Sequence, residues 1–348
     1  MIEMEIALED GTVWAGLGRG GSAKGEVVFT TAPTGYPQAV SDPSFAGQIL
    51  VFAFPMIGNY GVDEDLLESP RPWARAVVVG SLECGDSLGP SFEEWLARFD
   101  VPLVSGVDTR SLVRHIRTAG ALPGTVSPVG GGENCLPERN VHPVAEVSPL
   151  SPEVFEGPGV TVVVLDYGLK QGILRELLRR GCRVIKLPHL SSREEILSWD
   201  PDGVLLGNGP GDPALLFPEI DVVTSLLGAV PIGGICLGLQ VAALASGAST
   251  FKLPFGHRGA NHAVVDIRTG RGFVTSQNHG YAVLETSLES TGLEITHRNL
   301  GDGSIEGLRN PEQSLVAVQY HPEGSPGPGD GEEFFEEFLS LCERGMTR

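Results

Sequence analysis

From about residue 160, the chain alternates uninterrupted apolar runs with amphipathic segments. The apolar runs are VTVVVLDYG, CRVIKLP, GVLLGNG and VPIGGI, and segments such as KQGILRELLRRG and LGLQVAALASG lie between them. Runs without polar alternation are typical of strands buried on both faces, and strands that alternate with helices form parallel sheets. The second half is therefore predicted to be a doubly wound, mostly parallel α/β sheet.

Strand and turn signals dominate the first part of the chain. MEIALEDGTVWAGLGRGG alternates, turns at Asp10-Gly11 and resumes, which predicts a hairpin, and GEVVFTT, QILVFAFP and RAVVVGS predict further strands. SFEEWLARFD and DTRSLVRHIRTAG predict helices, the first with a capping box of Ser91 and Glu94. We expect a mixed α+β domain. The stretch 127–159 is rich in Pro, Gly and Ser, so we predict one domain over 1–150 and another over 151–348.

The composition excludes several classes of partner. The formal net charge is −20 and no basic patch is visible, so we expect neither a nucleic acid nor a membrane as partner. No apolar run approaches the roughly 18 residues that span a bilayer, and the N-terminus does not resemble a signal peptide. Five scattered cysteines without a CxxC pair indicate a reduced cytoplasm and no metal site.

Cys236 stands in the most unusual setting of the five cysteines. In GICLG it is flanked by Gly234 and Gly238, where an apolar strand passes into a helix. This Gly-x-nucleophile-x-Gly pattern is that of a nucleophile elbow, which lifts the side chain above the sheet at a helix N-terminus. The helix dipole stabilises a thiolate there. The backbone N–H of Leu237 is then a candidate donor to an oxyanion.

A thiolate nucleophile needs a base. His321 follows the apolar strand LVAVQY, and Glu323 lies two residues beyond it. Such a set would work as a triad in which Glu fixes the imidazole, His carries the proton and Cys attacks. His279 and His257 are alternative bases. The loop NGPGDP follows another strand, and Gly209 and Gly211 could expose backbone N–H groups there as an oxyanion hole.

Three motifs carry a resemblance to a known family. NGPGDP, GICLG-x-Q and YHPE, in this order, resemble the class I (triad) glutamine amidotransferases, and the similarity covers the second half of the chain. In that family the cysteine attacks the side-chain amide of L-glutamine, ammonia leaves, and a glutamyl thioester is hydrolysed. The resemblance implies that Cys236, His321 and Glu323 are catalytic.

The first half narrows the resemblance. GEVVFTTAPTGYPQAVSDPSFAGQILVFAFPMIGNYG and VSGVDTRSLVRHIRTAG, with SQNHGYAV, GHRGANH and EGSPGPGD later, are similar to the carbamoyl-phosphate synthetase small-chain family. The resemblance implies a glutaminase function for arginine and pyrimidine synthesis. The glutamine site that it implies consists of Ser44, Gly209, Gly211, Leu237, Gln240, Asn278, Gly280 and Tyr281.

The synthetase reaction needs ATP, and this chain has no Walker loop. The resemblance therefore implies a partner, the carbamoyl-phosphate synthetase large chain, which uses the ATP and receives ammonia through an internal tunnel. We expect no cofactor in this chain, and we expect residues 1–150 to dock on the large chain. Two alternatives stay open: a glutaminase of anthranilate, CTP or GMP synthesis, or a degenerate, non-catalytic scaffold. The additional first half argues against the former, and the intact Cys236, His321 and Glu323 argue against the latter.

Overall fold

The computed structural model describes residues 1–131 and 142–345, which fall into two compact units. The N-terminal unit comprises Met1–Val141 and Pro254–Gly259, and the C-terminal unit comprises His142–Leu253 and Ala260–Arg348. The division precedes the predicted boundary near residue 150. The reason is that Val144, in α4 (Val144–Val147), is fully buried in the apolar core of the C-terminal unit. Cys135 lies outside the described residues.

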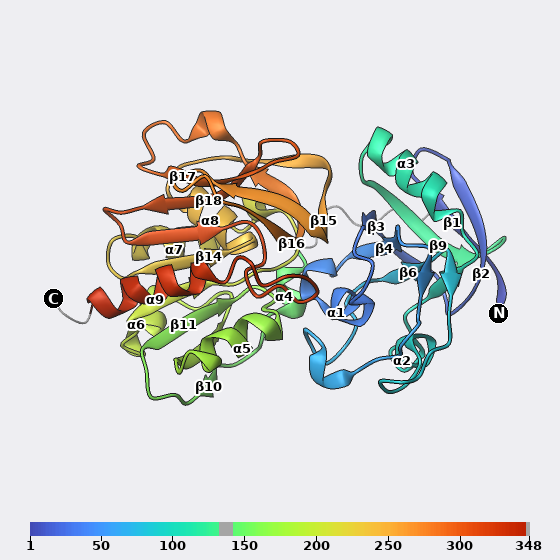
Figure 1. Cartoon of the computed structure of the whole chain (residues 1–348), viewed down its shortest axis with the longest axis horizontal. Helices are drawn as coiled ribbons and strands as arrows, with labels where there is room; N and C mark the ends of the chain where they lie inside the picture. The colour runs from blue at the N-terminus through green and yellow to red at the C-terminus, as the bar shows by residue number, and fades with distance from the viewer. Residues whose placement is uncertain (132–141, 346–348) are drawn as a thin grey trace. The chain divides into compact units, whose positions relative to one another are not determined.

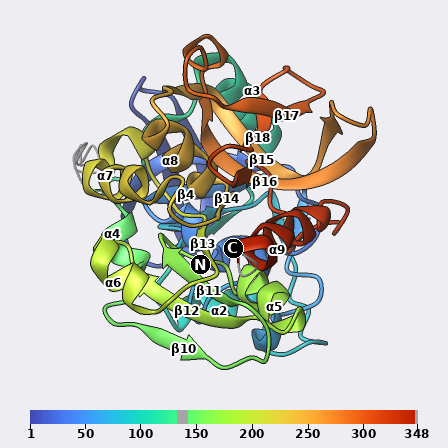
Figure 2. The ribbon, with the colours of Figure 1, turned by 90° about the vertical axis from the view of Figure 1, so that its left-hand side faces the viewer.

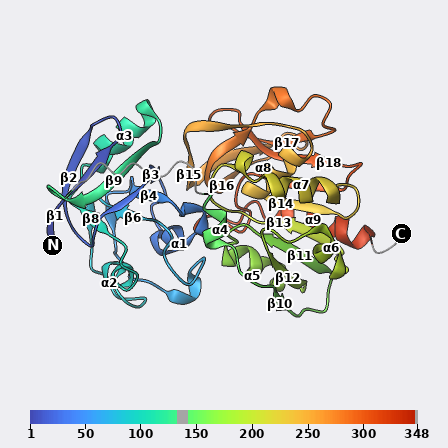
Figure 3. The ribbon, with the colours of Figure 1, turned by 180° about the vertical axis from the view of Figure 1, so that it is seen from behind.

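The N-terminal unit is built around a closed β-barrel (Figure 3). The hairpin predicted at Asp10-Gly11 is confirmed, because β1 and β2 pair antiparallel. Around the barrel the strands follow the order β1 (Ile2–Leu8), β2 (Val13–Arg19), β8 (Leu103–Ser105), β6 (Ala76–Val78), β4 (Gln48–Phe52), β3 (Ala23–Thr30) and β9 (Leu122–Pro128). A separate short pair joins β5 (Met56–Ile57) and β7 (Ser81–Leu82).

The helices of this unit follow the predicted signals. In α2 (Phe92–Ala97) the capping box of Ser91 and Glu94 is present, and α3 (Thr109–Ala119) ends at Gly120 as expected. The α3 side chains Leu112 and Ile116 are buried with Met4 and Ile6 of β1 in one apolar cluster. The remaining helical segments are α1 (Tyr36–Ser41), η1 (Pro43–Phe45) and η2 (Glu64–Leu66). Closure of the strands into a barrel was not part of the prediction.

The C-terminal unit contains a 10-stranded sheet (Figure 1). The strands β12, β11, β13, β14 and β19 are parallel neighbours, whereas the strands toward both edges pair antiparallel. In spatial order they are β10 (Glu153–Phe155), β12 (Arg183–Pro188), β11 (Thr161–Asp166), β13 (Gly203–Leu206), β14 (Ile232–Ile235), β19 (Leu315–Val318), β18 (Ile305–Asn310), β17 (Glu294–Asn299), β15 (Thr250–Asp266) and β16 (Gly272–Val283).

Helices cover both faces of this sheet (Figure 2). On one face α5 (Gln171–Arg179) and α9 (Glu333–Gly345) pack on the sheet, and α6 (Arg193–Ser198), α7 (Phe217–Leu226) and α8 (Leu237–Ala245) pack on the other. Short 3₁₀ turns, η3 (Pro213–Leu215) and η4 (Glu285–Ser287), complete the unit. The predicted doubly wound, mostly parallel sheet is confirmed. After residue 260 the strands vary in length, from the 12 residues of β16 to the 4 of β19.

The described part of the chain contains no helix that combines the length and the apolar character needed to cross a membrane.

Candidate active site

Four loops meet at one edge of the parallel sheet. They follow β11, β13, β14 and β19, which are hydrogen-bonded in the order β11-β13-β14-β19 and run parallel. Ligands of open α/β sheets bind beyond the carboxyl ends of such strands. The loops after β13, β14 and β19 contain Gly209, Cys236 and His321, so the sheet brings together motifs that are far apart in the sequence.

Cys236 forms the sharp turn between β14 and α8. Its backbone has φ 56° and ψ −105°, a conformation that residues with a side chain rarely adopt. The flanking glycines make the turn possible: a Cβ on Gly234 would lie 2.8 Å from the carbonyl carbon of Gly238, and one on Gly238 would collide with the Leu206 carbonyl. The predicted nucleophile elbow is therefore present in the backbone geometry.

The thiol of Cys236 is held beneath the surface. The residue is 2% exposed, its N–H donates to the Val318 carbonyl (2.8 Å), and Sγ lies 3.6 Å from the carbonyl oxygen of Asn278. Two other cysteines are buried in apolar packing, where burial raises the pKa of Cys182 to about 11 and that of Cys342 to about 12. Cys84 is exposed. Among the described cysteines, Cys236 is the one at a strand–helix elbow.

His321 and Glu323 form a buried pair. His321 Nδ1 lies 2.7 Å from Glu323 Oε1, and both side chains are at most 1% exposed. Because a carboxylate only accepts, Nδ1 carries the hydrogen and Nε2 is the nitrogen left for proton transfer. His321 Nε2 is buried and makes no hydrogen bond to the described residues. The Cys236 thiol is among the groups that raise the His321 pKa.

Lys170 forms a buried ion pair with Glu323. Its Nζ lies 2.6 Å from Glu323 Oε1, with the lysine side chain 2% exposed and the glutamate side chain 0% exposed. Burial alone raises the pKa of Glu323, but the Lys170 and His321 cations outweigh it and lower that pKa below its ordinary value. For His321, burial lowers the pKa and the Glu323 carboxylate more than reverses this. The arrangement stabilises an ionised Glu323 beside a protonated imidazole.

Lys170 was missed in the sequence analysis. It follows β11 as the N-cap of α5, and its backbone N–H donates to Asn208 Oδ1 (3.0 Å) in the NGPGDP loop. The signal was available: Lys170 stands four residues after the end of the strand TVVVLD, at the same sheet edge as the other motifs. Its pairing with a glutamate 153 positions later could not be inferred from sequence.

The NGPGDP loop lies against the elbow. A Cβ on Gly209 would lie 2.9 Å from Leu237 Cδ2 and would collide with the Tyr167 carbonyl, so only glycine fits between them. Gly211 has φ 94°, which favours glycine. The structure therefore places Gly209 beside Leu237, at the N-terminus of α8, where the first N–H groups have no acceptor within the helix, and places Gly211 against His142 and Pro143.

The strand β16 carries three of the other predicted residues. The Asn278 carbonyl contacts Cys236, and Gln240 Nε2 donates to the Tyr281 carbonyl (2.8 Å) and to Gln319 Oε1 (3.0 Å). Gly280 lies between Asn278 and Tyr281 on this strand. These contacts fix β16 to α8, beside the elbow. A direct role in holding glutamine stays a prediction for all of them.

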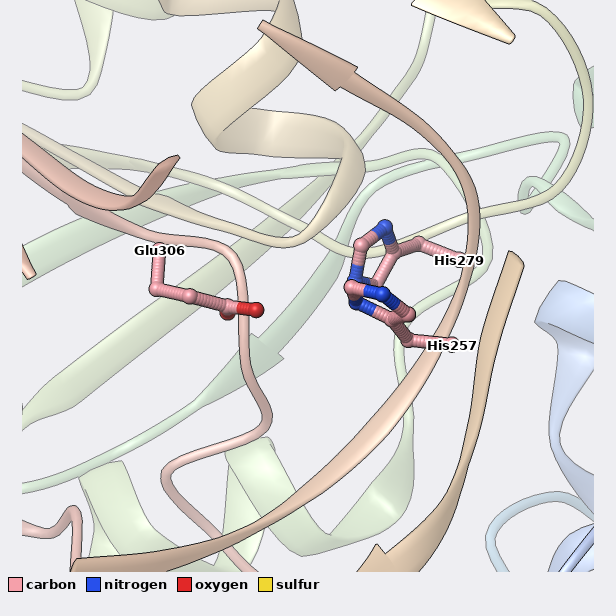
Figure 4. A group of neighbouring side chains, drawn as sticks. All are labelled: His257, His279 and Glu306. Atoms are coloured by element: carbon pink, nitrogen blue, oxygen red, sulfur yellow. The ribbon is translucent and has the colours of Figure 1, made fainter. Parts of the chain in front are cut away.

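His279, an alternative base, makes other contacts. Its Nδ1 lies 2.7 Å from the Tyr281 carbonyl and its Nε2 lies 2.8 Å from Gln277 Oε1. Both nitrogens are therefore held by neighbours on β16, which favours His321 as the base. Figure 4 shows His279 on its strand, with Glu306, which accepts from Asn299 Nδ2 (2.9 Å). His257, also drawn there, belongs to the N-terminal unit.

Ser44 belongs to the N-terminal unit. It lies in η1, and its N–H donates to Asp42 Oδ1 (2.8 Å), which closes a turn at the start of the 3₁₀ segment. Its part in a glutamine site stays a prediction.

Comparisons with known proteins identify the family of this chain. The family model "Glutamine amidotransferase class-I" matches residues 163–341, and "Carbamoyl-phosphate synthase small chain, CPSase domain" matches residues 6–126. The carbamoyl phosphate synthase small chain of Staphylococcus epidermidis is 46% identical over 347 residues, covering 97% of this chain and 95% of the relative. That of Bacillus thuringiensis subsp. konkukian is 45% identical over 353 residues, covering 98% and 96%. The chain therefore belongs to the carbamoyl phosphate synthase small-chain family and carries a class I glutamine amidotransferase domain.

Proposed function

We propose that this chain is the glutaminase subunit of a carbamoyl-phosphate synthetase, with Cys236 as nucleophile. The observation that carries the proposal is the buried set in which Glu323 lies 2.7 Å from His321 Nδ1 and 2.6 Å from Lys170 Nζ, at the sheet edge where Cys236 forms the elbow. In the first half-reaction the thiolate attacks the amide carbon of glutamine. His321 Nε2 holds the thiol proton and gives it to the leaving amine, so ammonia departs and a glutamyl thioester remains.

The second half-reaction uses the same groups in reverse order. Water attacks the thioester carbon and gives a proton to His321 Nε2; the sulfur leaves and recovers that proton, and glutamate is released. Glu323 accepts from Nδ1–H throughout and stabilises the imidazolium, and Lys170 keeps Glu323 ionised. No group is oxidised or reduced, and the step needs no cofactor in this chain.

The negative charge that forms on the amide oxygen needs donors. The N–H of Leu237, at the start of α8, and the N–H groups of Gly209 and Gly211 are the proposed donors. Glutamine itself would be held by the remaining predicted side chains and backbone groups, which are Ser44, Gln240, Asn278, Gly280 and Tyr281.

We propose that the ammonia is consumed by the large chain of the same enzyme. The relatives are named as small chains, and the match to the small-chain domain over residues 6–126 separates this chain from amidotransferases that lack such a half. On this proposal the large chain performs the ATP-dependent steps, and the N-terminal unit docks on it. The cytoplasmic location expected from the cysteine content belongs to the same proposal.

The test uses one variant and two nitrogen donors. In the assembled enzyme, Cys236→Ser should abolish carbamoyl phosphate synthesis from glutamine, because a serine hydroxyl is a far weaker nucleophile than a thiolate. Synthesis from ammonium salt should persist, since the partner then receives ammonia from solution. Full glutamine-dependent activity of Cys236→Ser would contradict the nucleophile, and loss of both activities in an assembled enzyme would contradict the division of labour.

A further inference from the structure

His142 lies directly against the loop that carries Gly209 and Gly211. Its Nε2 is 3.0 Å from the carbonyl oxygen of Asp212. A Cβ built on Gly211 would lie 3.0 Å from the same nitrogen, so the ring also packs on the residue before Asp212. One imidazole therefore contacts two successive residues of the turn whose N–H groups are the proposed oxyanion donors.

The contacts of His142 fix its tautomer. A carbonyl can only accept, so Nε2 donates to Asp212, and Nδ1 is placed to accept from the N–H of Val144 at 3.4 Å. The neutral Nε2–H form satisfies both contacts, whereas the imidazolium would set a second N–H against that of Val144. Burial lowers the pKa of His142, which favours the same neutral form.

The segment that follows His142 is anchored in the C-terminal unit. Val144 is fully buried in the core, and Ser148 Oγ accepts from the N–H of His189 (2.9 Å). The His189 ring is held in turn, because Nδ1 lies 2.6 Å from Oε1 of Glu219, a side chain of α7 that is 2% exposed. Glu219 and His189 face His142 with opposite effects on its pKa, the former raising and the latter lowering it.

Within the turn, the printed bonds hold Asp212 and lie after Gly211: the Asp212 carbonyl accepts from the N–H of Leu215 (3.1 Å), and Asp212 Oδ1 accepts from that of Ala214 (2.9 Å). Gly211 adopts φ 94° and has no side chain, so its conformation has to be selected by neighbours. On one side the Tyr167 carbonyl packs against Gly209, and on the other His142 packs on Gly211 and bonds to Asp212. The two contacts enclose the stretch from Gly209 to Asp212.

We propose that His142 is a positioning residue for glutamine hydrolysis. By donating from Nε2 to the Asp212 carbonyl, it fixes the turn in the one conformation that aims the Gly211 N–H at the developing oxyanion. This inference rests on the proposed function and adds a residue outside the triad and the motifs. Because the oxyanion exists only in the transition state, loss of this contact should lower kcat more than it raises KM for glutamine.

Two amide variants separate the donor from the bulk of the ring. In His142→Gln the side-chain amide reaches the place of Nε2 and can donate to Asp212. In His142→Asn the shorter amide reaches the place of Nδ1, so it can accept from Val144 but cannot reach Asp212. We expect His142→Asn to lower kcat by about 10-fold or more, with KM within about 3-fold, and His142→Gln to stay within about 3-fold of the parent in both.

The measurements are glutaminase kcat and KM of the full chain and the rate at which iodoacetamide modifies Cys236. The modification rate should not differ between the two variants, since the elbow is untouched. The control is His115→Asn in the N-terminal unit, whose ring pairs with Asp10 and should have no effect on kcat. Parental kcat in His142→Asn, or equal losses in the Asn and Gln variants, would overturn the inference.

Failure of the proposed function is separately visible. If Cys236→Ser hydrolyses glutamine, the nucleophile is misassigned whatever His142 does. If Cys236→Ser is inactive while His142→Asn keeps the parental kcat, only the positioning role falls.

Discussion

The two units of this molecule bury charge in different ways. In the N-terminal unit the barrel interior is an apolar cluster that includes Met4, Ile6 and Val27, and an ion pair such as Arg98–Glu64 (2.8 Å) leaves both side chains more than half exposed. In the C-terminal unit Lys170 and Glu323 pair at 2.6 Å with almost no exposure.

The difference concerns the free energy of folding, to which apolar burial and buried ion pairs contribute with opposite signs. Apolar burial stabilises at about 25 cal/mol per Å², whereas each buried ion costs several kcal/mol of desolvation that its partners have to offset. The apolar cluster around Met4 and Ile6 follows the first rule, although the N-terminal unit also buries the charged Glu68 and Asp42. In the C-terminal unit the Lys170–Glu323 pair lies at the carboxyl ends of β11 and β19, at the candidate active site, whereas other buried charges, such as Glu219 of α7 and Glu306 of β18, lie elsewhere in the unit. Breaking one pair in each unit therefore tests the comparison.

The largest expected effect is that of Lys170→Met. It leaves Glu323 buried without its lysine, and breaking a buried pair in this way costs about 3–5 kcal/mol of unfolding free energy. We expect glutaminase kcat/KM to fall by about 100-fold or more, because Glu323 then no longer holds His321 in the required protonation state. Hydrogen exchange in each unit and steady-state kinetics measure the two effects.

The matched control is Arg98→Met, which removes one partner of the exposed pair. It should cost under about 1 kcal/mol and leave kcat/KM unchanged. Equal destabilisation by the two variants would remove the distinction between the units, and parental activity in Lys170→Met would exclude the lysine from the site.

A smaller effect is expected from glycine substitutions. Gly211 (φ 94°) and Gly106 (φ 75°) both have backbone conformations that favour glycine, but a Cβ at Gly106 meets open space whereas one at Gly211 meets His142. Gly211→Val should lower kcat by about 100-fold, the size expected for a lost oxyanion donor. Gly106→Val should show only the backbone strain, about 1–2 kcal/mol, with parental kcat. Parental kcat/KM in a folded Gly211→Val would exclude this glycine from the site.

The smallest effect is the pH dependence of stability. The lowered pKa of Glu323 contributes stability above its ordinary value of 4.5 that is lost as the pH falls through the lowered pKa. The raised pKa of His321 contributes stability that is complete below its ordinary value of 6.5 and is lost as the pH rises through the raised pKa. The free energy of unfolding of the parent should therefore exceed that of the double variant His321→Asn/Glu323→Gln by the largest margin near about pH 5.5.

Urea unfolding at about pH 5.5 and pH 9.5 measures the difference in unfolding free energy between the parent and the double variant. This difference should be smaller at the higher pH. In the N-terminal unit the pKa of Asp10 is also lowered, chiefly by the hydroxyl of Thr12, but this carboxylate is exposed. Asp10→Asn should leave the pH dependence close to that of the parent. A gap between parent and double variant that grows toward alkaline pH would contradict the assigned direction for His321.

Local patterns predicted the elements that depend on local physics. The capping box of Ser91 and Glu94, the hairpin at Asp10-Gly11 and the parallel strands all follow from propensity and periodicity. The elbow at Cys236 was also predictable, because small residues around one nucleophile are a local requirement. Because β13, β14 and β19 run parallel, their carboxyl ends meet at one edge of the sheet, and the NGPGDP loop and His321 both follow at that edge.

Long-range pairings were beyond these patterns. Closure of the barrel depends on β1 pairing with β9, more than 100 residues apart, and β3 with β4 in parallel. Lys170 and His142 have no motif of their own; their partners Glu323 and Asp212 are brought to them only by the fold. The C-terminal unit begins at His142 rather than near the predicted residue 150, because Val144 packs into the core of that unit, which is another contact between distant parts of the chain.

Cys236 is the proposed nucleophile, and the most direct test of this role is to identify the thiol that reacts. The comparison of units makes the test sharp, because the exposed Cys84 lies in the N-terminal unit whereas Cys236 is buried at the elbow. Peptide mapping after treatment with a diazo-ketone analogue of glutamine should find the label on Cys236, and excess glutamine should slow the labelling. Label mainly on Cys84, Cys135, Cys182 or Cys342 would contradict the account.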